Sequence, residues 1–172
     1  MTLASRTLEQ RAQALLGPGR RGPRASTRPL RVALLGCGGI GSALAQELAS
    51  HPGFEVCAAL VRDAVRPRAI PAERLHTTLD GVLGANPDVA VECMGGVETP
   101  AQLGAQLLRR GVHLVSANKS MVASALPTLS AAARLGGAHL RFDAAVCAGT
   151  PVLEAVATLA SAGVQRVDGI VN

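Results

Sequence analysis

One stretch of the sequence has the residue types and spacing that bind a nucleotide phosphate. An apolar run, Val32 to Leu35, leads into a G-x-G-x-x-G pattern that opens into residues 42–48, which have helical composition. In such a strand–turn–helix unit the glycines form a tight turn and let the backbone approach a pyrophosphate, while the helix start offers free N–H groups. In a chain with 19 glycines the pattern is informative only because of this context. We therefore predict dinucleotide binding, against an ordinary strand–helix turn, by Gly36, Gly38, Gly39, Ile40 and Gly41.

The residue that follows the second predicted strand, Glu55 to Val61, bears on which dinucleotide fits. An acidic residue there usually binds the ribose 2′-hydroxyl of NAD, whereas an arginine nearby accepts the 2′-phosphate of NADP. This sequence has Arg62, then Asp63, with Arg66 and Arg68 close by. We expect Arg62 to favour NADP(H). Asp63 leaves NAD(H) open, and a solvated charged loop is the alternative interpretation.

Lys119 is the only lysine among the 17 basic residues, and it follows the strand predicted over residues 112–116. An ammonium group can approach a carbonyl as a point donor and can lose its proton when desolvated, which a guanidinium cannot do. We predict a catalytic role for Lys119. The alternative is a surface lysine without function.

The elements that must position these residues alternate along the chain. Strands predicted over residues 32–35, 55–61, 88–92, 112–116, 138–146 and 164–171 are separated by helical stretches. This alternation indicates an α/β fold with a Rossmann-like, doubly wound, mainly parallel sheet. Ligands bind at the carboxyl ends of strands in such sheets. Five segments should therefore line one crevice: Gly36 to Gly41, Arg62, Gly95-Gly96, Asn118-Lys119 and Gly149-Thr150.

Prolines guide the prediction of the helices. Residues 64–78 read as irregular, followed by a short helix near 79–83. Pro100 is expected at the first position of a helix that runs to about Arg110. Pro127 is expected to break or start a helix, and further helices are predicted over residues 5–16 and 151–162.

Composition excludes several classes of function. No apolar run is long enough to span a membrane, so we expect a soluble protein without a membrane partner. Seven arginines and one acidic residue lie in residues 1–31, so the remainder is close to neutral, and with only two aromatic residues it is a poor nucleic-acid binder. The dispersed cysteines and histidines predict buried thiols in a reducing cytoplasm and no histidine metal site.

Several blocks of the sequence resemble the cofactor domain of homoserine dehydrogenase. They are Gly36-Cys-Gly-Gly-Ile-Gly41, Val91-Glu-Cys-Met-Gly-Gly96, Val115-Ser-Ala-Asn-Lys119, Phe142-Asp-Ala-Ala-Val-Cys-Ala-Gly-Thr-Pro151 and Asp168-Gly-Ile-Val-Asn172. The resemblance implies NAD(P)H-dependent reduction of aspartate semialdehyde to homoserine, in the biosynthesis of threonine, methionine and isoleucine. It also implies that Lys119 contacts the nicotinamide side of the cofactor and lies close to the substrate, with Gly95, Gly96 and Asn118 also in the cofactor site.

By the same resemblance, a monovalent cation, usually sodium, binds largely through main-chain oxygens. The positions that match its ligands are Asp143, Val146, Ala148 and Thr150. The family usually has glutamate where this chain has Asp143, which puts a side-chain contribution in doubt and leaves the carbonyl ligands in place.

The resemblance also predicts the organisation of the chain. Residues 1–29 are expected to be a flexible Arg/Gly/Pro-rich extension, although their composition also resembles a transit peptide. Residues 30–150 form the dinucleotide-binding domain, and residues 151–172 begin an incomplete substrate domain, which in the family also forms the homodimer. Two alternatives stay open: another Rossmann-type dehydrogenase of an amino acid or sugar, and a non-catalytic NADP-binding module.

Overall fold

The computed structural model describes residues 28–146, 150, 152–163, 166 and 168. The helix predicted over residues 5–16 lies outside the described residues, and so does the strand predicted over 164–171 apart from Arg166 and Asp168. In chain order the elements are β1 (Leu30–Leu35), α2 (Gly39–Ala49), β2 (Phe54–Leu60), η2 (Ala72–Arg74), β3 (Leu75–His76), α3 (Leu79–Gly84), β4 (Val89–Glu92), α4 (Glu98–Arg109), β5 (His113–Ser116), α5 (Lys119–Gly136), β6 (Leu140–Arg141), η3 (Asp143–Ala145) and α6 (Val152–Ser161).

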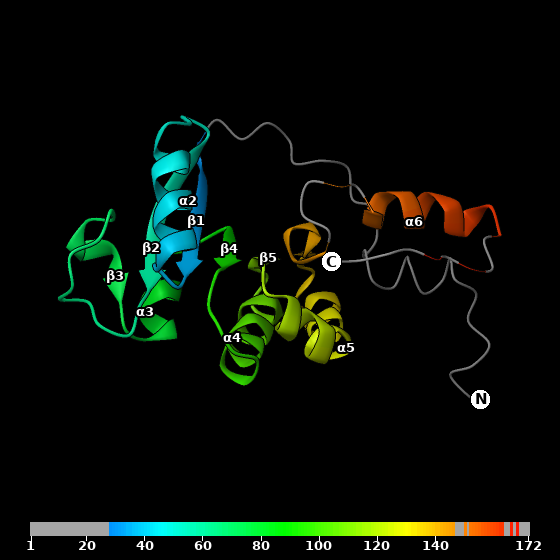
Figure 1. Ribbon diagram of the computed structural model, residues 1–172. Helices are drawn as coiled ribbons and strands as arrows, with labels where there is room; N and C mark the ends of the chain where they lie inside the picture. Colours follow the sequence, from blue (N-terminus) through cyan, green and yellow to red (C-terminus); the bar gives the residue numbers. More distant parts are fainter. Residues whose placement is uncertain (1–27, 147–149, 151, 164–165, 167, 169–172) are drawn as a thin grey trace.

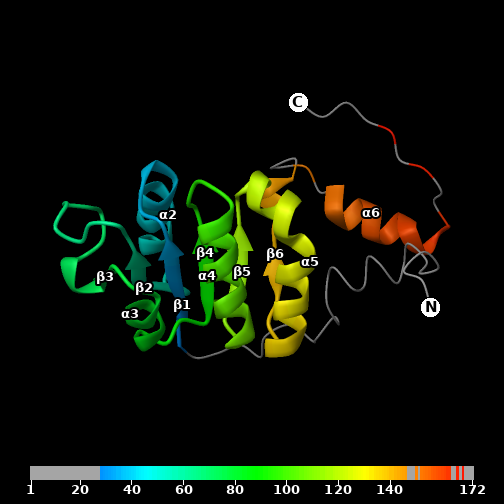
Figure 2. The same ribbon diagram turned by 90° about the horizontal axis from the view of Figure 1, so that it is seen from below.

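The described strands form one six-stranded sheet in the order β3-β2-β1-β4-β5-β6, and every neighbouring pair is parallel (Figure 2). The chain builds outward from β1 to β3, crosses back to β4, and then builds outward in the opposite direction to β6. The order therefore reverses between β1 and β4. This is the Rossmann-like, doubly wound arrangement predicted from the alternation of strands and helices.

Both faces of the central strand β1 are buried, as a parallel sheet requires. Ala33 and Leu35 belong to the apolar core that α3, α4 and α5 cover. Val32 and Leu34 belong to the core on the other face, which α2 covers (Figure 1). All four side chains are at most 2 % exposed. The continuous apolar run that predicted this strand is thus explained by burial from two sides.

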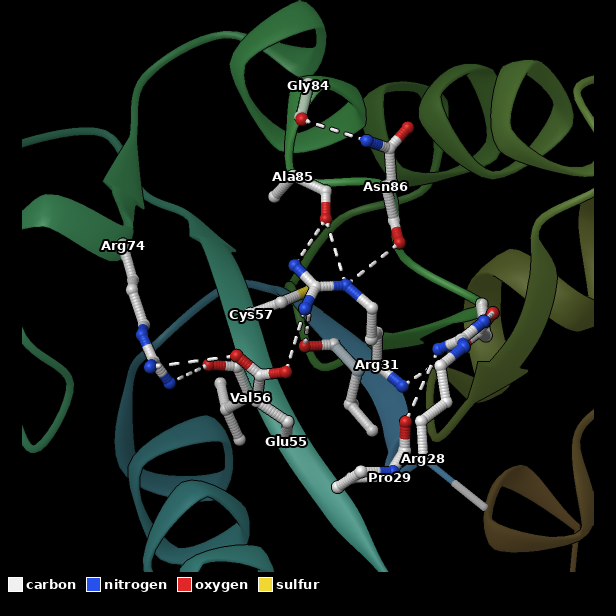
Figure 3. A network of polar contacts seen from close by, with 12 residues as sticks. Arg28, Pro29, Arg31, Glu55, Val56, Cys57, Arg74, Gly84, Ala85 and Asn86 are labelled. Atoms are coloured by element: carbon white, nitrogen blue, oxygen red, sulfur yellow. Dashed lines mark hydrogen bonds and ion pairs between the residues drawn. The ribbon is translucent and has the colours of Figure 1, made fainter. Parts of the chain in front are cut away.

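The amino edge of the sheet is held by ion pairs and hydrogen bonds centred on Arg31 (Figure 3). Its guanidinium donates to Glu55 Oε2 at 2.7 Å and to the carbonyl oxygen of Ala85 at 2.8 Å. Its backbone N–H donates to Asp88 Oδ2 at 2.8 Å, and Arg28 binds the same carboxylate through both guanidinium nitrogens. These contacts connect β1 to β2 and to the segment before β4.

Pro127 does not break or start a helix, contrary to the prediction, because α5 continues through it from Lys119 to Gly136. Proline removes the N–H that would donate to the carbonyl of Ala123. Both Ala123 and Pro127 are exposed, so water can satisfy that carbonyl. A proline on the solvent face of a long, otherwise well-packed helix is therefore tolerated.

Three other boundaries differ from the prediction. β6 covers only Leu140–Arg141 of the strand expected over 138–146, because its neighbour β5 is four residues long and pairs with it at only two positions. Within the stretch predicted as irregular, Leu75–His76 adds a short edge strand beside β2. α4 begins at Glu98, so Pro100 is its third residue, still within the first turn where the backbone N–H needs no helical acceptor.

No helix in the described part of the chain is both long and apolar enough to cross a membrane.

Candidate functional site

The turn after β1 needs glycine at two of its positions. Gly36 has φ +96°, and a Cβ on it would lie 3.1 Å from Met94 Cγ and 3.2 Å from the carbonyl oxygen of Cys93. A Cβ on Gly41 would overlap the carbonyl oxygen of Gly36. The first glycine therefore permits both the turn and the close approach of the segment after β4. The last glycine lets the first turn of α2 sit directly against that turn.

Gly38 and Gly39 are glycines for a different reason, since no atom lies within 4 Å of a Cβ built on either of them. Gly38 is the N-cap of α2 and supplies no side-chain cap, and no acidic residue lies in the first turn. The first N–H groups of a helix have no intrahelical acceptor and carry a partial positive charge. The backbone here is bare and positive, as a bound phosphate requires. Ile40, the next residue, is 65 % exposed beside it.

The segment that follows β4 is anchored by a buried carboxylate. Glu92 is the last residue of β4 and is 0 % exposed. Its Oε1 accepts a hydrogen bond from the backbone N–H of Met94, and its Oε2 accepts one from the hydroxyl of Ser116, both at 2.7 Å. Ser116 lies directly opposite Glu92 in the register of β4 and β5. The carboxyl ends of these two strands are thereby joined by side chains as well as by the sheet.

Asn118 links the same segment to the start of α5. Its amide nitrogen donates to the carbonyl oxygens of Gly96, at 2.8 Å, and Met94, at 3.3 Å. Its Oδ1 accepts from the backbone N–H of Met121 at 3.0 Å, so Asn118 also caps α5. Gly96, whose carbonyl oxygen accepts from Asn118, has φ +87°, a backbone conformation that favours glycine. The structure therefore brings together the predicted Gly95-Gly96 and Asn118-Lys119 segments.

Lys119 is the first residue of α5, and its side chain is exposed. No ion pair or hydrogen bond joins its ammonium group to another described residue. It follows Asn118 directly, so it lies at the carboxyl edge of the sheet with the segments described above. Its catalytic role stays a prediction.

Arg62 is exposed and lies two residues past the end of β2, at the same edge as the glycine turn. The turn and β2 are connected directly, because the N–H of Gly36 donates to the carbonyl oxygen of Leu60 at 3.0 Å. Asp63, the competing acidic residue, accepts a hydrogen bond from the N–H of Val65 at 2.8 Å. No described residue forms an ion pair or hydrogen bond with the Arg62 side chain.

The predicted cation ligands follow β6. Asp143 is exposed at the start of η3, and its carbonyl oxygen accepts from the N–H of Val146 at 3.0 Å. The carbonyl oxygen of Thr150 accepts from the N–H of Val152 at 2.7 Å. Ala148, with Gly149 beside it, lies outside the described residues. The cation site therefore stays a prediction.

One cysteine, Cys37, lies in the glycine turn, and another, Cys93, lies beside it. The pKa of the Cys93 thiol is raised to about 11 by burial, with smaller contributions from the charge of Glu92 and from Cys37. Cys37 Sγ lies 3.6 Å from the hydroxyl oxygen of Ser42 in the first turn of α2. Cys93 is consequently a neutral thiol near pH 7 and a poor nucleophile, since the thiolate is the reactive form.

No role for Glu92 or Ser116 follows from the sequence, although both lie in blocks that resemble homoserine dehydrogenase. The available signal was a glutamate closing an otherwise apolar strand, Val89–Glu92. A charge in a strand covered on both faces is costly unless it is hydrogen-bonded. Its partners on β5 and in the following loop become visible only in three dimensions.

Comparisons with known proteins identify the family. Residues 36–143 match the family described as "Homoserine dehydrogenase, NAD binding domain". A homoserine dehydrogenase of Synechocystis sp. is 33% identical over 155 residues, which are 83% of this chain and 36% of that protein. The solved homoserine dehydrogenase of Thiobacillus denitrificans superposes with a TM-score of 0.63 at 32% identity, over 74% of this chain and 32% of that one.

A relative with a different name is also similar. "L-aspartate dehydrogenase 1" of Bordetella pertussis is 37% identical over 131 residues, which are 74% of this chain and 49% of that protein. The chain spans about a third of the length of the homoserine dehydrogenases it matches. The family match covers most of the sheet, from the glycine turn to η3. The chain therefore belongs to the homoserine dehydrogenase family, and the part it matches is the NAD-binding domain of that family.

Proposed function

We propose that this chain binds NADP(H), and that the whole protein reduces L-aspartate 4-semialdehyde to L-homoserine. The observation that carries the proposal is the uncapped start of α2, which follows the tight turn at Gly36 with no side chain over Gly38 or Gly39. A pyrophosphate can reach the bare N–H groups only where such a Cβ-free surface exists. The order of the sheet reverses beside it, where dinucleotides bind in this fold.

The preference for NADP(H) is supported by the loop after β2. Arg62 is exposed and has no partner among the described residues, whereas one carboxylate oxygen of Asp63 is occupied by the N–H of Val65. Arg68 donates to the carbonyl oxygens of Asp63 and Arg66, at 2.6 and 2.8 Å, and so holds the loop together. A guanidinium beside the adenosine ribose would form charge-assisted hydrogen bonds with a 2′-phosphate.

The residues that would face the reacting end of the cofactor are Gly95, Gly96, Asn118 and Lys119. Nicotinamide supplies or accepts a hydride when it is bound. Asn118 would fix the loop beneath it, since its amide already holds the carbonyl oxygens of Met94 and Gly96. Lys119 would place a positive charge or a proton near the substrate oxygen, which stabilises the negative charge that develops there.

Several features of the whole protein belong to the same proposal. Residues 30–150 would form the cofactor domain, and residues 151–172 would begin the substrate domain that continues in full-length relatives. That domain would supply the groups that hold the substrate and form a homodimer. Carbonyl oxygens near Asp143, Val146, Ala148 and Thr150 would bind sodium. The enzyme would serve biosynthesis of the aspartate family of amino acids in the cytoplasm.

Calorimetric titration of this chain with NADP⁺ and with NAD⁺ tests the cofactor assignment. We expect tighter binding of NADP⁺, by about 1–3 kcal/mol for charge-assisted hydrogen bonds to one phosphate, and loss of that preference in Arg62→Ala. Equal affinity for the two dinucleotides, or an unchanged ratio in the variant, would remove Arg62 from the site.

The second candidate is an amino-acid dehydrogenase of another specificity, favoured by the similarity to L-aspartate dehydrogenase. A form of the protein that includes the substrate domain should reduce NADP⁺ with L-homoserine and not with L-aspartate. The opposite result would favour the second candidate. Dinucleotide binding without turnover of either substrate would favour a non-catalytic NADP-binding module.

A further inference from the structure

Glu92 places a carboxylate at a buried position, which the packing of the core does not require. The residue is 0 % exposed at the carboxyl end of β4, and no ion pair joins it to another described residue. Burying a carboxylate without a cation is costly, and an apolar residue of similar size would fill the same volume at lower cost. Ala90, two positions earlier in β4, belongs to the apolar core. The charge at the end of β4 therefore needs an explanation beyond the core.

Three groups donate hydrogen bonds toward the Glu92 carboxylate. The N–H of Met94 and the hydroxyl of Ser116 donate at 2.7 Å, and the amide nitrogen of Asn118 lies 3.5 Å from Oε1. The hydroxyl oxygen of Ser116 in turn accepts from the backbone N–H of Asn118 at 3.0 Å. Both oxygens of the Glu92 side chain are therefore used as acceptors.

The bonds form a closed network. Glu92 accepts from Ser116, and Ser116 accepts from the backbone N–H of Asn118. The side-chain amide of Asn118 donates to the carbonyl oxygens of Met94 and Gly96. The N–H of Met94 donates to Glu92 and closes the network. Two strand ends, the loop after β4 and the N-cap of α5 are thus fixed relative to one another. Removal of the carboxylate would leave two donors without an acceptor at the base of that loop.

We propose that Glu92 is a positioning residue for the nicotinamide half of the dinucleotide site. This inference rests on the proposed function. In the doubly wound fold the two halves of a dinucleotide lie on the two halves of the sheet. The glycine turn and Arg62 belong to the half built from β1 to β3, whereas the network of Glu92 lies wholly in the half built from β4 to β6. Glu92 touches neither half of the ligand and acts through the loop and Asn118.

The test compares a whole dinucleotide with its adenosine half. Glu92→Gln keeps the size of the side chain and removes the charge and one acceptor. We expect this variant to bind NADP⁺ about tenfold more weakly or worse, the loss that corresponds to one charged hydrogen bond. Its affinity for adenosine 2′,5′-bisphosphate should be unchanged, because that fragment occupies the half from β1 to β3. Ser116→Ala should weaken NADP⁺ binding in the same way, and Ser116→Thr, which keeps the hydroxyl, should restore it.

Val82→Ala serves as the matched control, because Val82 is 0 % exposed in α3 and outside the network. It should lower the melting temperature and leave both affinities unchanged. Equal NADP⁺ affinity in the parent and Glu92→Gln, or an equal loss for both ligands, would overturn the inference. Hydrogen exchange tests the positioning role of Glu92 without any ligand. The backbone amides of Met94 and Asn118 should exchange faster in Glu92→Gln than in Val82→Ala. Equal protection of these amides in the two variants would refute the positioning role. A parent chain that binds neither dinucleotide would instead refute the proposed function.

Discussion

Replacement of Gly38 by alanine separates the binding role of the glycine turn from its role in folding. Gly38 has φ −86° and ψ −151°, a conformation that alanine can adopt, and a Cβ there meets no atom within 4 Å. Alanine is a poorer N-cap than glycine, but it also lowers the conformational entropy of the unfolded chain, which stabilises the fold by about 0.4–1 kcal/mol. These effects oppose one another, so the free energy of unfolding should change by less than about 1 kcal/mol.

The effect of Gly38→Ala on binding should be much larger. The added methyl group would occupy the open side of the turn, where in the proposed site a pyrophosphate approaches the N–H groups of α2. Loss of one charge-assisted hydrogen bond costs about 1.5–3 kcal/mol, which corresponds to about 10- to 100-fold in Kd. Calorimetry with NADP⁺, together with thermal melting of the free chain, measures both quantities on the same preparation.

Two further alanine variants serve as controls for this experiment. Gly41→Ala would place a Cβ against the carbonyl oxygen of Gly36, so stability and binding should fall together. Gly84→Ala adds its methyl group at the end of α3, where no atom lies within 4 Å, so it should leave binding unchanged and should not lower stability. An unchanged Kd in Gly38→Ala, or a fall in melting temperature as large as that of Gly41→Ala, would refute the reasoning.

Two other substitutions test the two edges of the sheet. In a form with the substrate domain, Lys119→Ala should lower kcat at least about tenfold with little change in melting temperature, because the side chain is exposed; near-normal turnover would make it a surface lysine. Hydrogen bonds from Arg28 and from the N–H of Arg31 hold the pKa of Asp88 below its ordinary value of 3.8. The ionised carboxylate therefore contributes its full stabilisation above about pH 3.8, and this contribution is lost as the pH falls through the lowered pKa. Asp88→Asn should therefore cost about 1 kcal/mol at pH 7, and chemical unfolding at several pH values should show the difference from the parent vanish at low pH; a constant difference would contradict it.

The fold could be predicted from the sequence wherever a local pattern determines the structure. The apolar run of β1 and the glycines after it specify a buried strand, a tight turn and a helix without reference to the rest of the chain. The same holds for the alternation of strands and helices, from which the doubly wound sheet follows. These features depend on residues that are neighbours in sequence.

The incorrect boundaries depend on neighbours in space. Residues 138–146 have strand composition, but β6 ends at Arg141, where the pairing to Val115 of β5 ends. Pro127 is a helix breaker by composition, yet its position on the exposed side of α5 removes most of the penalty. In both cases the missing information was what lies beside the segment, which a single sequence does not contain.

The candidate site shows the same division. Gly36, Arg62 and Lys119 could be selected from the sequence because their chemistry and their places at strand ends are local properties. The hydrogen bonds of Glu92 could not be predicted, because its partners Ser116 on β5 and Asn118 at the N-cap of α5 lie 24 and 26 positions away in the chain. A buried charge in an apolar strand predicts that partners exist, but the sequence alone does not identify them.

The two edges of the sheet use charge in opposite ways. At the amino edge Arg28 and Arg31 are paired with Asp88 and Glu55, so their charges are neutralised within the fold. At the carboxyl edge, Arg62 and Lys119 form no ion pair with a described residue, and the positive end of α2 carries no acidic cap. A polypeptide whose sequence after residue 31 is close to neutral thus keeps two exposed basic side chains and an acid-free helix start at the carboxyl edge. The distribution of charge, and not its sum, provides for a phosphate-rich ligand there.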